Sequence, residues 1–282
     1  MTIIEWVVSQ HAEEAAFLWL LRDAAVSAPH YSLADLAELD RRVERHIKGL
    51  RVAGDEGWPW CVEGLQQEES GEVFAAAMTA FDGEDPRRIE QVCAAVESAP
   101  ETARGFISAL GWTARDKLGG KVAGLLESNS PLWRRVGIAA CAVHRADCGE
   151  YLSRALEDAD PMLRARALRA AGETARWDLL PALRGQIRSQ DPTYGFWAAW
   201  SAVLLGDREE SLSALQSTAV GALPGAPEGA CHRLWCQRRS RLYPLAYYPN
   251  GGGTGSGACR RRIPEPDHGP GYHRRGPGAG CT

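Results

Sequence analysis

The sequence predicts an all-α protein built as an α-solenoid, a row of helix pairs stacked on one another. Three dipeptides, Ser130-Pro131, Asp160-Pro161 and Asp191-Pro192, open nearly the same helical pattern at steps of 30 and 31 residues. A fixed period of this length is typical of solenoid repeats. The alternating valine- and threonine-rich runs that mark strands are rare, so we expect no β-sheet.

Each repeat begins with residues that favour the start of a helix. Asp160 is a good N-cap, and Pro161 suits the first turn because its missing N–H would have no partner there. Arg164 follows Asp160 by four residues, which is close enough for an ion pair. Small residues such as Ala167 and Ala170 let the two helices of a pair approach closely. Because one pair cannot bury its apolar face alone, its stability has to come from stacking against its neighbours.

For residues 1–69 we expect a helical N-terminal module. Apolar residues recur at helical spacing over residues 3–26 and 33–50. Ser32 should cap the second of these helices, because its hydroxyl can accept a hydrogen bond from a backbone N–H of the first turn. A third helix is expected to open with Trp58-Pro59-Trp60.

Residues 70–217 are expected to hold about five helix pairs, the three clear repeats and two less regular pairs before them. The patterns of the two earlier pairs cover residues 72–81 with 86–97, and residues 101–112 with 115–126.

Residues 218–282 are expected to form a disordered tail rich in glycine, proline and arginine. From Gly221 onward, nine arginines stand against three acidic residues, so this part carries about +6 and the rest about −10. It has little helical periodicity and too few apolar residues to form a core. Two origins are open, a native flexible tail or out-of-frame reading of a GC-rich gene, and we favour the second. In that case the last repeat lacks its C-terminal cap.

We expect a cytoplasmic protein that does not bind a membrane. The N-terminus lacks the basic region and cleavage site of a signal peptide. The longest apolar runs, residues 17–21 and 196–205, are too short to span a bilayer. The cysteines of the body lack a disulfide framework, which fits a reducing compartment. We expect Cys141 and Cys148, with His144 between them, to fill the core and not to bind a metal.

The repeats carry the features of a known repeat family. The unit that begins at Asp160 shows the full pattern: an Asp-Pro opening, an apolar residue and an arginine, an alanine-rich first helix, a turn and, at residues 179–183, the run Leu-Leu-Pro-Ala-Leu. This pattern resembles HEAT repeats of the short bacterial kind. Residues 11–22, 30–54 and 196–208 are similar to an uncharacterised bacterial family of HEAT-containing proteins, and the resemblance covers about residues 1–215. It implies no assigned activity, and some members are encoded near type VI secretion genes.

No catalytic, cofactor or metal site is predicted. His11 and Glu14 lie three residues apart, and His30 and His46 flank the second helix, but their spacing matches no standard zinc signature. Packing or capping is the favoured role of these histidines. HEAT proteins that hold a di-iron centre use paired His-Glu dipeptides, and this sequence has none.

Tryptophan and arginine predict the binding surface, because interface hot spots favour both residue types. The candidate residues are Trp133, Arg134, Arg164, Trp177, Trp197 and Trp200. Most tryptophans of the repeats should pack between layers, which leaves one or two to meet a partner.

A ladder of arginines along the solenoid is the basis of an alternative function. The arginines are Arg134, Arg135, Arg164, Arg166 and Arg169. HEAT-like DNA glycosylases hold DNA on a basic face with aromatic residues, so nucleic-acid binding is a second hypothesis. Against it, the charge of about −10 on the body would repel phosphate. We favour solvated arginines paired to Asp158, Asp160 and Glu173, and a non-catalytic scaffold or adaptor whose partner is another protein.

Overall fold

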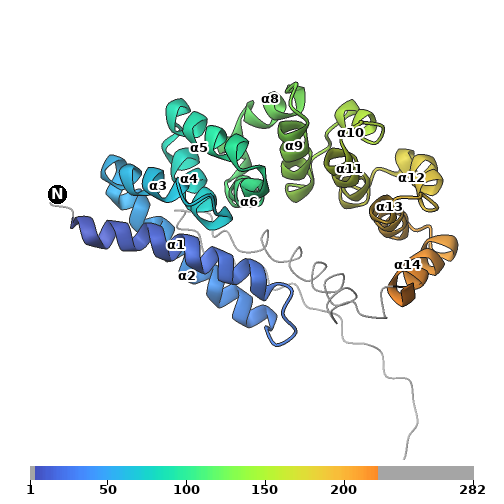
Figure 1. Ribbon diagram of the computed structural model, residues 1–282, viewed down its shortest axis with the longest axis horizontal. Coiled ribbons are helices and arrows are strands. Elements are labelled where there is room, and N and C mark those ends of the chain that lie inside the picture. The colour runs from blue at the N-terminus through green and yellow to red at the C-terminus, as the bar shows by residue number, and fades with distance from the viewer. Residues whose placement is uncertain (1–3, 222–282) are drawn as a thin grey trace, which may run out of the picture. The chain divides into compact units, whose positions relative to one another are not determined.

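The computed structural model describes residues 4–221, and in this part of the chain every regular element is a helix (Figure 1). The predicted all-α solenoid is therefore confirmed. The α-helices are α1 (Glu5–Ala25), α2 (Leu33–Ala53), α3 (Trp58–Leu65), α4 (Ser70–Gly83), α5 (Pro86–Ser98), α6 (Ala103–Trp112), α7 (Arg115–Leu118), α8 (Lys121–Glu127), α9 (Pro131–Val143), α10 (Glu150–Ala155), α11 (Pro161–Glu173), α12 (Leu180–Gln186), α13 (Pro192–Leu204) and α14 (Glu209–Gly221). Short 3-10 turns cover Gly54–Gly57, Pro100–Thr102 and Trp177–Leu179.

The N-terminal helices α1 and α2 pack against each other, and α1 also packs against α4. Ser32 and Asp35 form the full capping box at the start of α2, which confirms the predicted cap. Arg22 of α1 pairs with Asp40 of α2 at 2.9 Å. The indole of Trp19 stacks on Phe74 of α4 with ring centroids 5.3 Å apart. The N-terminal module and the first repeat therefore share one core.

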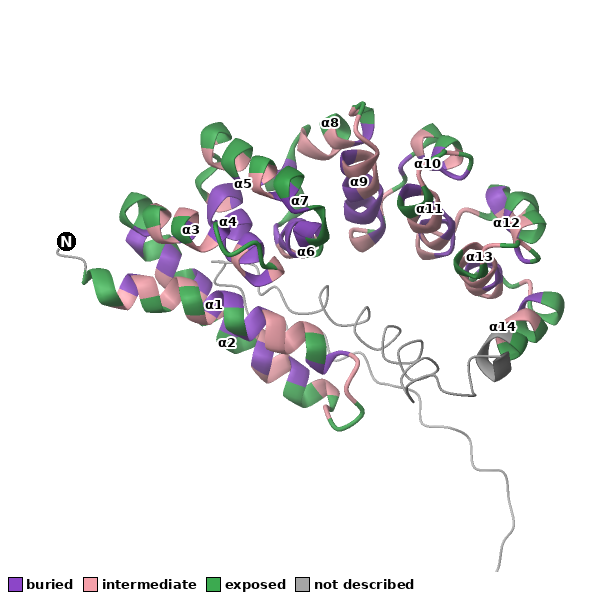
Figure 2. Ribbon diagram, viewed as in Figure 1, coloured by how far each residue is buried: buried purple, intermediate pink, exposed green. Residues whose placement is uncertain are grey.

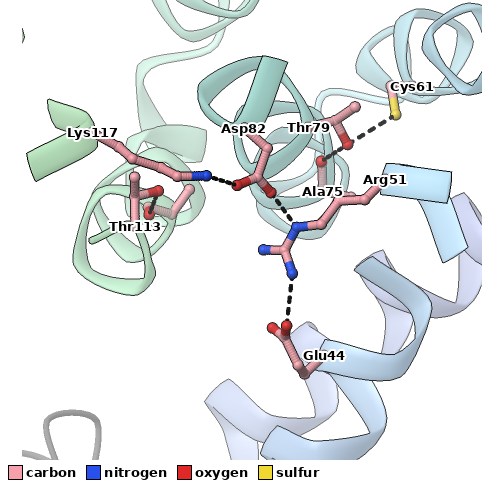
Figure 3. Close-up of polar contacts among 9 residues, drawn as sticks. Glu44, Arg51, Cys61, Ala75, Thr79, Asp82, Thr113 and Lys117 are labelled. Carbon is pink, nitrogen blue, oxygen red and sulfur yellow. Dashed lines mark hydrogen bonds and ion pairs between the residues drawn. The ribbon is translucent and has the colours of Figure 1, made fainter. Parts of the chain in front are cut away.

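Asp82 at the end of α4 joins three parts of the chain (Figure 3). Its carboxylate accepts hydrogen bonds from Arg51 of α2 and, at 3.2 Å, from Lys117 of α7. Arg51 also pairs with Glu44 at 2.7 Å.

Nearby, burial raises the pKa of the Cys61 thiol to about 11, so this cysteine behaves as an apolar core residue.

Within residues 70–221 the first helices of five pairs, α4, α6, α9, α11 and α13, follow one another in a row (Figure 1). Of the second helices, α5 and α14 pack on the first helix of their own pair, α4 and α13. In contrast, α8, α10 and α12 pack mainly on the first helix of the following pair, α9, α11 and α13. One predicted helix is wrong: residues 115–126 form α7 and α8. Gly119 and Gly120 separate them, and Gly119 adopts a φ of 45°, which breaks the helix.

The three proline-led units start alike but are not capped alike. Asp160 accepts a hydrogen bond from the N–H of Leu163 at 2.7 Å, and Asp191 accepts one from Thr193 at 2.7 Å. Ser130, at the same position, makes no side-chain cap. A second shared contact was not foreseen. The N–H of each cap residue donates to the side chain two residues before it, in Ser128, Asp158 and Ser189.

The first helices of these units also end alike. The residue fourteen positions after each proline is left-handed, with φ of 51° at Arg145, 56° at Ala175 and 95° at Gly206. In each case the next residue's N–H bonds back to a helix carbonyl, for example from Ala146 to Cys141 at 2.8 Å. This is the Schellman ending. Two of the three turns lack the glycine that usually signals it, so the sequence did not predict them.

The hydrophobic core of the described residues comprises two large clusters, from Val8 to Ala140 and from Leu126 to Leu205, and a small third cluster of Ala25, Val26, Leu36 and Leu39. In Figure 2 the helices α4 and α6 are mostly buried, whereas α11 and α13 carry many residues of intermediate burial. Glycine allows the closest approaches between first helices. A Cβ on Gly105 of α6 would overlap the carbonyl oxygen of Ser70, and one on Gly172 of α11 would lie 2.7 Å from Ser201 of α13.

The predicted disordered tail lies almost wholly outside the described residues. Helix α14 ends at Gly221, beyond the expected boundary at residue 217, and residues 222–282 lie outside the described part of the chain.

The capping difference predicts unequal effects of two equivalent substitutions. Asp160→Ala should lower the free energy of unfolding by about 1 kcal/mol, because the N–H of Leu163 loses its acceptor. Ser130→Ala is the matched control and should change it by only a few tenths of a kcal/mol. Urea denaturation of both variants measures the difference, and equal losses would contradict it.

The close approach of α4 and α6 predicts strong intolerance of a single methyl group. Gly105→Ala should cost about 3 kcal/mol of unfolding free energy, because the new methyl would meet the backbone of Ser70. Gly124→Ala in α8 has open space around it and should be neutral or stabilising by up to ~1 kcal/mol. Thermal denaturation of the pair is the measurement, and a tolerated Gly105→Ala would show that the helices are not in contact there.

Candidate partner-binding surface

The first helices of the three proline-led units present one side that their second helices do not cover. We call this side the open face. It consists of the residues 1, 4, 5, 8 and 12 positions after the proline, which share one side of a helix. They are Leu132, Arg135, Val136, Ala139 and Val143 in α9, Met162, Ala165, Arg166, Arg169 and Glu173 in α11, and Thr193, Phe196, Trp197, Trp200 and Leu204 in α13.

The chemistry of the open face changes from one unit to the next. In α9 it is mostly apolar, and Val136 and Ala139 are fully buried. In α11 it carries two arginines and a glutamate, and in α13 it is aromatic and partly exposed. Its edges end in exposed apolar side chains, with Met162 60% and Leu204 42% exposed. The repeat therefore sets the geometry, and each unit supplies different side chains.

In α11 two guanidinium groups share one carboxylate. Arg166 Nη2 donates to Glu173 at 3.0 Å, and Arg169 Nε donates to the other oxygen at 2.7 Å. The Glu173 side chain is only 4% exposed, compared with 13% and 19% for the two arginines. Burial lowers the pKa of Arg166 to about 10. Burial and then the charges of Arg166 and Arg104 lower the pKa of Arg169 to about 9. Both groups still carry their charge at neutral pH.

The aromatic part of the open face lies directly beside these charges. The guanidinium carbon of Arg169 is 4.5 Å from the ring centre of Trp197, within the range of a cation–π contact. Trp197 meets both Trp200 and Phe196 edge to face, with centroids 5.7 and 4.9 Å apart. Trp197 follows Phe196 directly in the chain and lies one turn before Trp200, so the contacts of Trp197 join the three rings into one continuous aromatic patch.

Of the six predicted binding residues, the structure brings Trp197 and Trp200 together. Trp133 instead lies in the core, 7% exposed, with its indole N–H donating to Glu97 at 2.6 Å. Arg134 fills a structural role, since it pairs with Asp158 at 2.8 Å and donates to the carbonyls of Ser128 and Asn129.

The other two predicted residues lie apart from the aromatic patch. The expected ion pair between Arg164 and Asp160 is absent from the interactions of the described residues. Arg164 instead stacks on Tyr194 of the next unit at 4.8 Å. Trp177 is 64% exposed and lies in the turn before α12, on the second-helix side of its pair.

From the sequence, Arg166 and Arg169 were predicted only as members of a row of arginines that could bind nucleic acid, and Phe196 was not predicted as a binding residue. The pairing of arginines with Asp158 and Glu173 is confirmed, but two of these arginines are mostly buried and not solvated. Aligning the units on their prolines would have shown that residues 165, 166 and 169 match residues 196, 197 and 200. That register is the signal that connects the arginines to the aromatic rings.

The histidines and cysteines that could suggest metal chemistry lie elsewhere. His11 and His46 contact each other between α1 and α2, with Nδ1 atoms 3.2 Å apart, and burial followed by the charge of His11 lowers the pKa of His46. Cys141 and Cys148 are buried in the core, as predicted. No group of three or more metal-ligating side chains occurs within the part of the chain that the structure describes. Within the same part, no helix is both long and apolar enough to cross a membrane.

The fold defines the protein as an all-α repeat protein of the solenoid class. Comparison with known families agrees: residues 150–221 match the family model described as HEAT repeats. The match covers the second helix of the first proline-led unit and all of the next two units. Neither the curated proteins nor the solved structures contain a match to this chain.

The shared carboxylate predicts a large effect of neutralising Glu173. Glu173→Gln leaves Arg166 and Arg169 without their counter-charge in a mostly buried position, so the unfolding free energy should fall by about 3 kcal/mol. Glu150→Gln removes the same kind of helical pair, with Arg154, at a position where both side chains are exposed, and should cost less than about 0.5 kcal/mol. Guanidinium denaturation compares the two, and similar costs would rule out a buried cluster.

Proposed function

We propose that this protein is a non-catalytic adaptor of the cytoplasm, which binds another protein through the open face of α11 and α13. The observation that carries this proposal is the aromatic patch of Phe196, Trp197 and Trp200. These large rings remain partly exposed, whereas the matching positions hold Arg135, Val136 and Ala139 in α9 and Ala165, Arg166 and Arg169 in α11. Partly exposed tryptophans beside an arginine are the side chains that most often dominate protein–protein interfaces.

The repeat architecture supports the same function. HEAT repeats are commonly scaffolds for protein interactions, and a stack of helix pairs presents an extended surface with a regular spacing of side chains. The structure provides such a row in α9, α11 and α13 (Figure 1). A rigid row of helices binds without first having to order itself, which limits the entropic cost of association.

A connection with bacterial secretion is the narrower form of this proposal. It rests on the resemblance of residues 11–22, 30–54 and 196–208 to a family whose genes lie near type VI secretion genes. Residues 196–208 include the aromatic patch. The partner would then be a secreted effector or a component of the secretion apparatus.

Nucleic-acid binding is the alternative, and the state of the arginines speaks against it. Arg134, Arg166 and Arg169 are each engaged with a carboxylate of the body. Phosphate binding by a basic face requires cations that are free to replace the counter-ions of the nucleic acid, and the body is acidic by about ten charges.

The proposal predicts that substitutions of Trp200 and Trp177 have different effects on partner binding. Trp200→Ser should weaken binding of the native partner by about thirtyfold or more, because it removes one of the three rings of the patch. Trp177→Ser is the matched control, since this tryptophan is more exposed but lies outside the open face. The partner is recovered from the native host by affinity capture, purified and titrated against both variants by calorimetry.

Three outcomes decide between the possibilities. Equal affinity of wild type and Trp200→Ser, with unchanged thermal denaturation, would remove the open face as the binding site. A partner unrelated to secretion would end only the narrower proposal. Tight, steeply salt-dependent binding of a DNA duplex that is lost in Trp200→Ser would favour the alternative.

A further inference from the structure

The cluster of Arg166, Arg169 and Glu173 contains more donors and more positive charge than it can satisfy internally. Two guanidinium groups present ten N–H donors, whereas one carboxylate offers two oxygens with about four acceptor sites. The cluster therefore carries one net positive charge. Arg166 Nη1 is buried and has no hydrogen-bond partner among the described residues. Because one fifth of the Arg169 side chain remains exposed, a ligand can reach this guanidinium from solvent.

The surroundings make this unbalanced charge unfavourable. Arg166 and Arg169 are held close to each other by Glu173, and Arg104 of α6 adds a third positive charge that acts on Arg169. Burial and these neighbours lower the pKa of Arg169, which means that the charged form is destabilised in the protein on its own. An anion that binds at this position relieves the repulsion. By linkage, the same interaction raises the pKa of Arg169.

The ligand also has an apolar surface to meet. The guanidinium of Arg169 lies over the ring of Trp197, and this contact restricts the side chain and leaves less conformational entropy to lose on binding. Trp200, Phe196 and the exposed Leu204 continue the surface on the same helix. A carboxylate close to Arg169 would therefore be followed, within one or two residues of an extended chain, by contact with aromatic rings.

We propose that the open face recognises an acidic segment of a protein partner, in which a carboxylate binds Arg169 and an adjacent aliphatic side chain packs on Trp197 and Trp200. This inference rests on the proposed function, and it specifies the chemistry of the partner. A carboxylate suits the site because a planar guanidinium binds it through two parallel hydrogen bonds. A nucleic acid suits it less, because a single net positive charge cannot match a row of phosphates.

The test is a titration of the full-length protein with three labelled peptides and one duplex. The first peptide has twelve residues and carries two Asp-Leu-Glu triplets between Gly-Ser spacers, the second replaces the acids with Asn and Gln, and the third replaces them with lysine. A twelve-base-pair DNA duplex completes the set. The readout is the NMR signal of the Trp197 indole N–H, assigned by its loss in Trp197→Phe. A local signal is needed because the arginines after Gly221 also attract acidic peptides.

The acidic peptide should shift the Trp197 signal with a dissociation constant at least tenfold below those of the neutral and lysine peptides. Arg169→Gln should raise that constant about tenfold, because a charge-assisted hydrogen bond is lost. Arg184→Gln on α12 removes the same charge from an exposed pair with Asp207 and should leave it unchanged. The comparison of acidic and neutral peptides on wild-type protein needs no variant, so it holds even if Arg169→Gln weakens folding.

Contrary results are equally clear. Equal binding of the acidic and neutral peptides, equal effects of Arg169→Gln and Arg184→Gln, or tighter binding of the duplex would each overturn the inference. Competition with the native partner separates it from the proposed function. If Trp200→Ser abolishes binding of the native partner but the acidic peptide does not compete with that partner, the adaptor function is supported and the proposal of an acidic segment is wrong. If the peptide binds through Arg169 but the affinity of the native partner is unchanged in Trp200→Ser, the partner binds at another site.

Discussion

The structure depends on the close packing of successive first helices, because no helix pair has a core of its own. Helices can approach this closely only where small side chains, or none, face the neighbour. Gly105 of α6 lies against the backbone of α4, and Gly172 of α11 lies against Ser201 of α13. The Ser201 hydroxyl then donates to the carbonyl of Leu168 at 2.7 Å, so even the polar group at this contact has a partner. Dense packing of this kind transmits the position of each layer to the next.

This constraint explains how the chain can keep its architecture while the open face changes. The buried positions hold alanine in each of the three units, together with a glycine in α9 and α11 and Ser201 in α13. The positions of the open face meet no such requirement. They carry small apolar residues in α9, a charged cluster in α11 and aromatic rings in α13. Architecture and binding chemistry are thus encoded by different sides of the same helices.

The same reasoning explains why the family match covers residues 150–221 and not the earlier part. In residues 70–127 the helix pairs are held by contacts that the regular repeat does not contain. Examples are the ion pairs of Asp82 with Arg51 and Lys117 (Figure 3). Another is the break at Gly119, which divides the second helix of the pair. The stack also begins with two long helices, so its first layer is closed by Trp19 and its neighbours and not by another repeat.

The sequence by itself determined the helices, because capping, proline placement and apolar periodicity act over a few residues. Ser32, Asp160 and Asp191 cap where local chemistry predicts, and the period of about thirty residues predicts the stacking of units. Tertiary structure decided the contacts that depend on the distance between units. Arg164 contacts Tyr194 of the next unit and not Asp160, and Trp133 lies in the core. Tertiary structure also brought Arg169 onto Trp197, 28 positions along the chain. These contacts follow from the register of one helix against the next, and no local pattern contains that register.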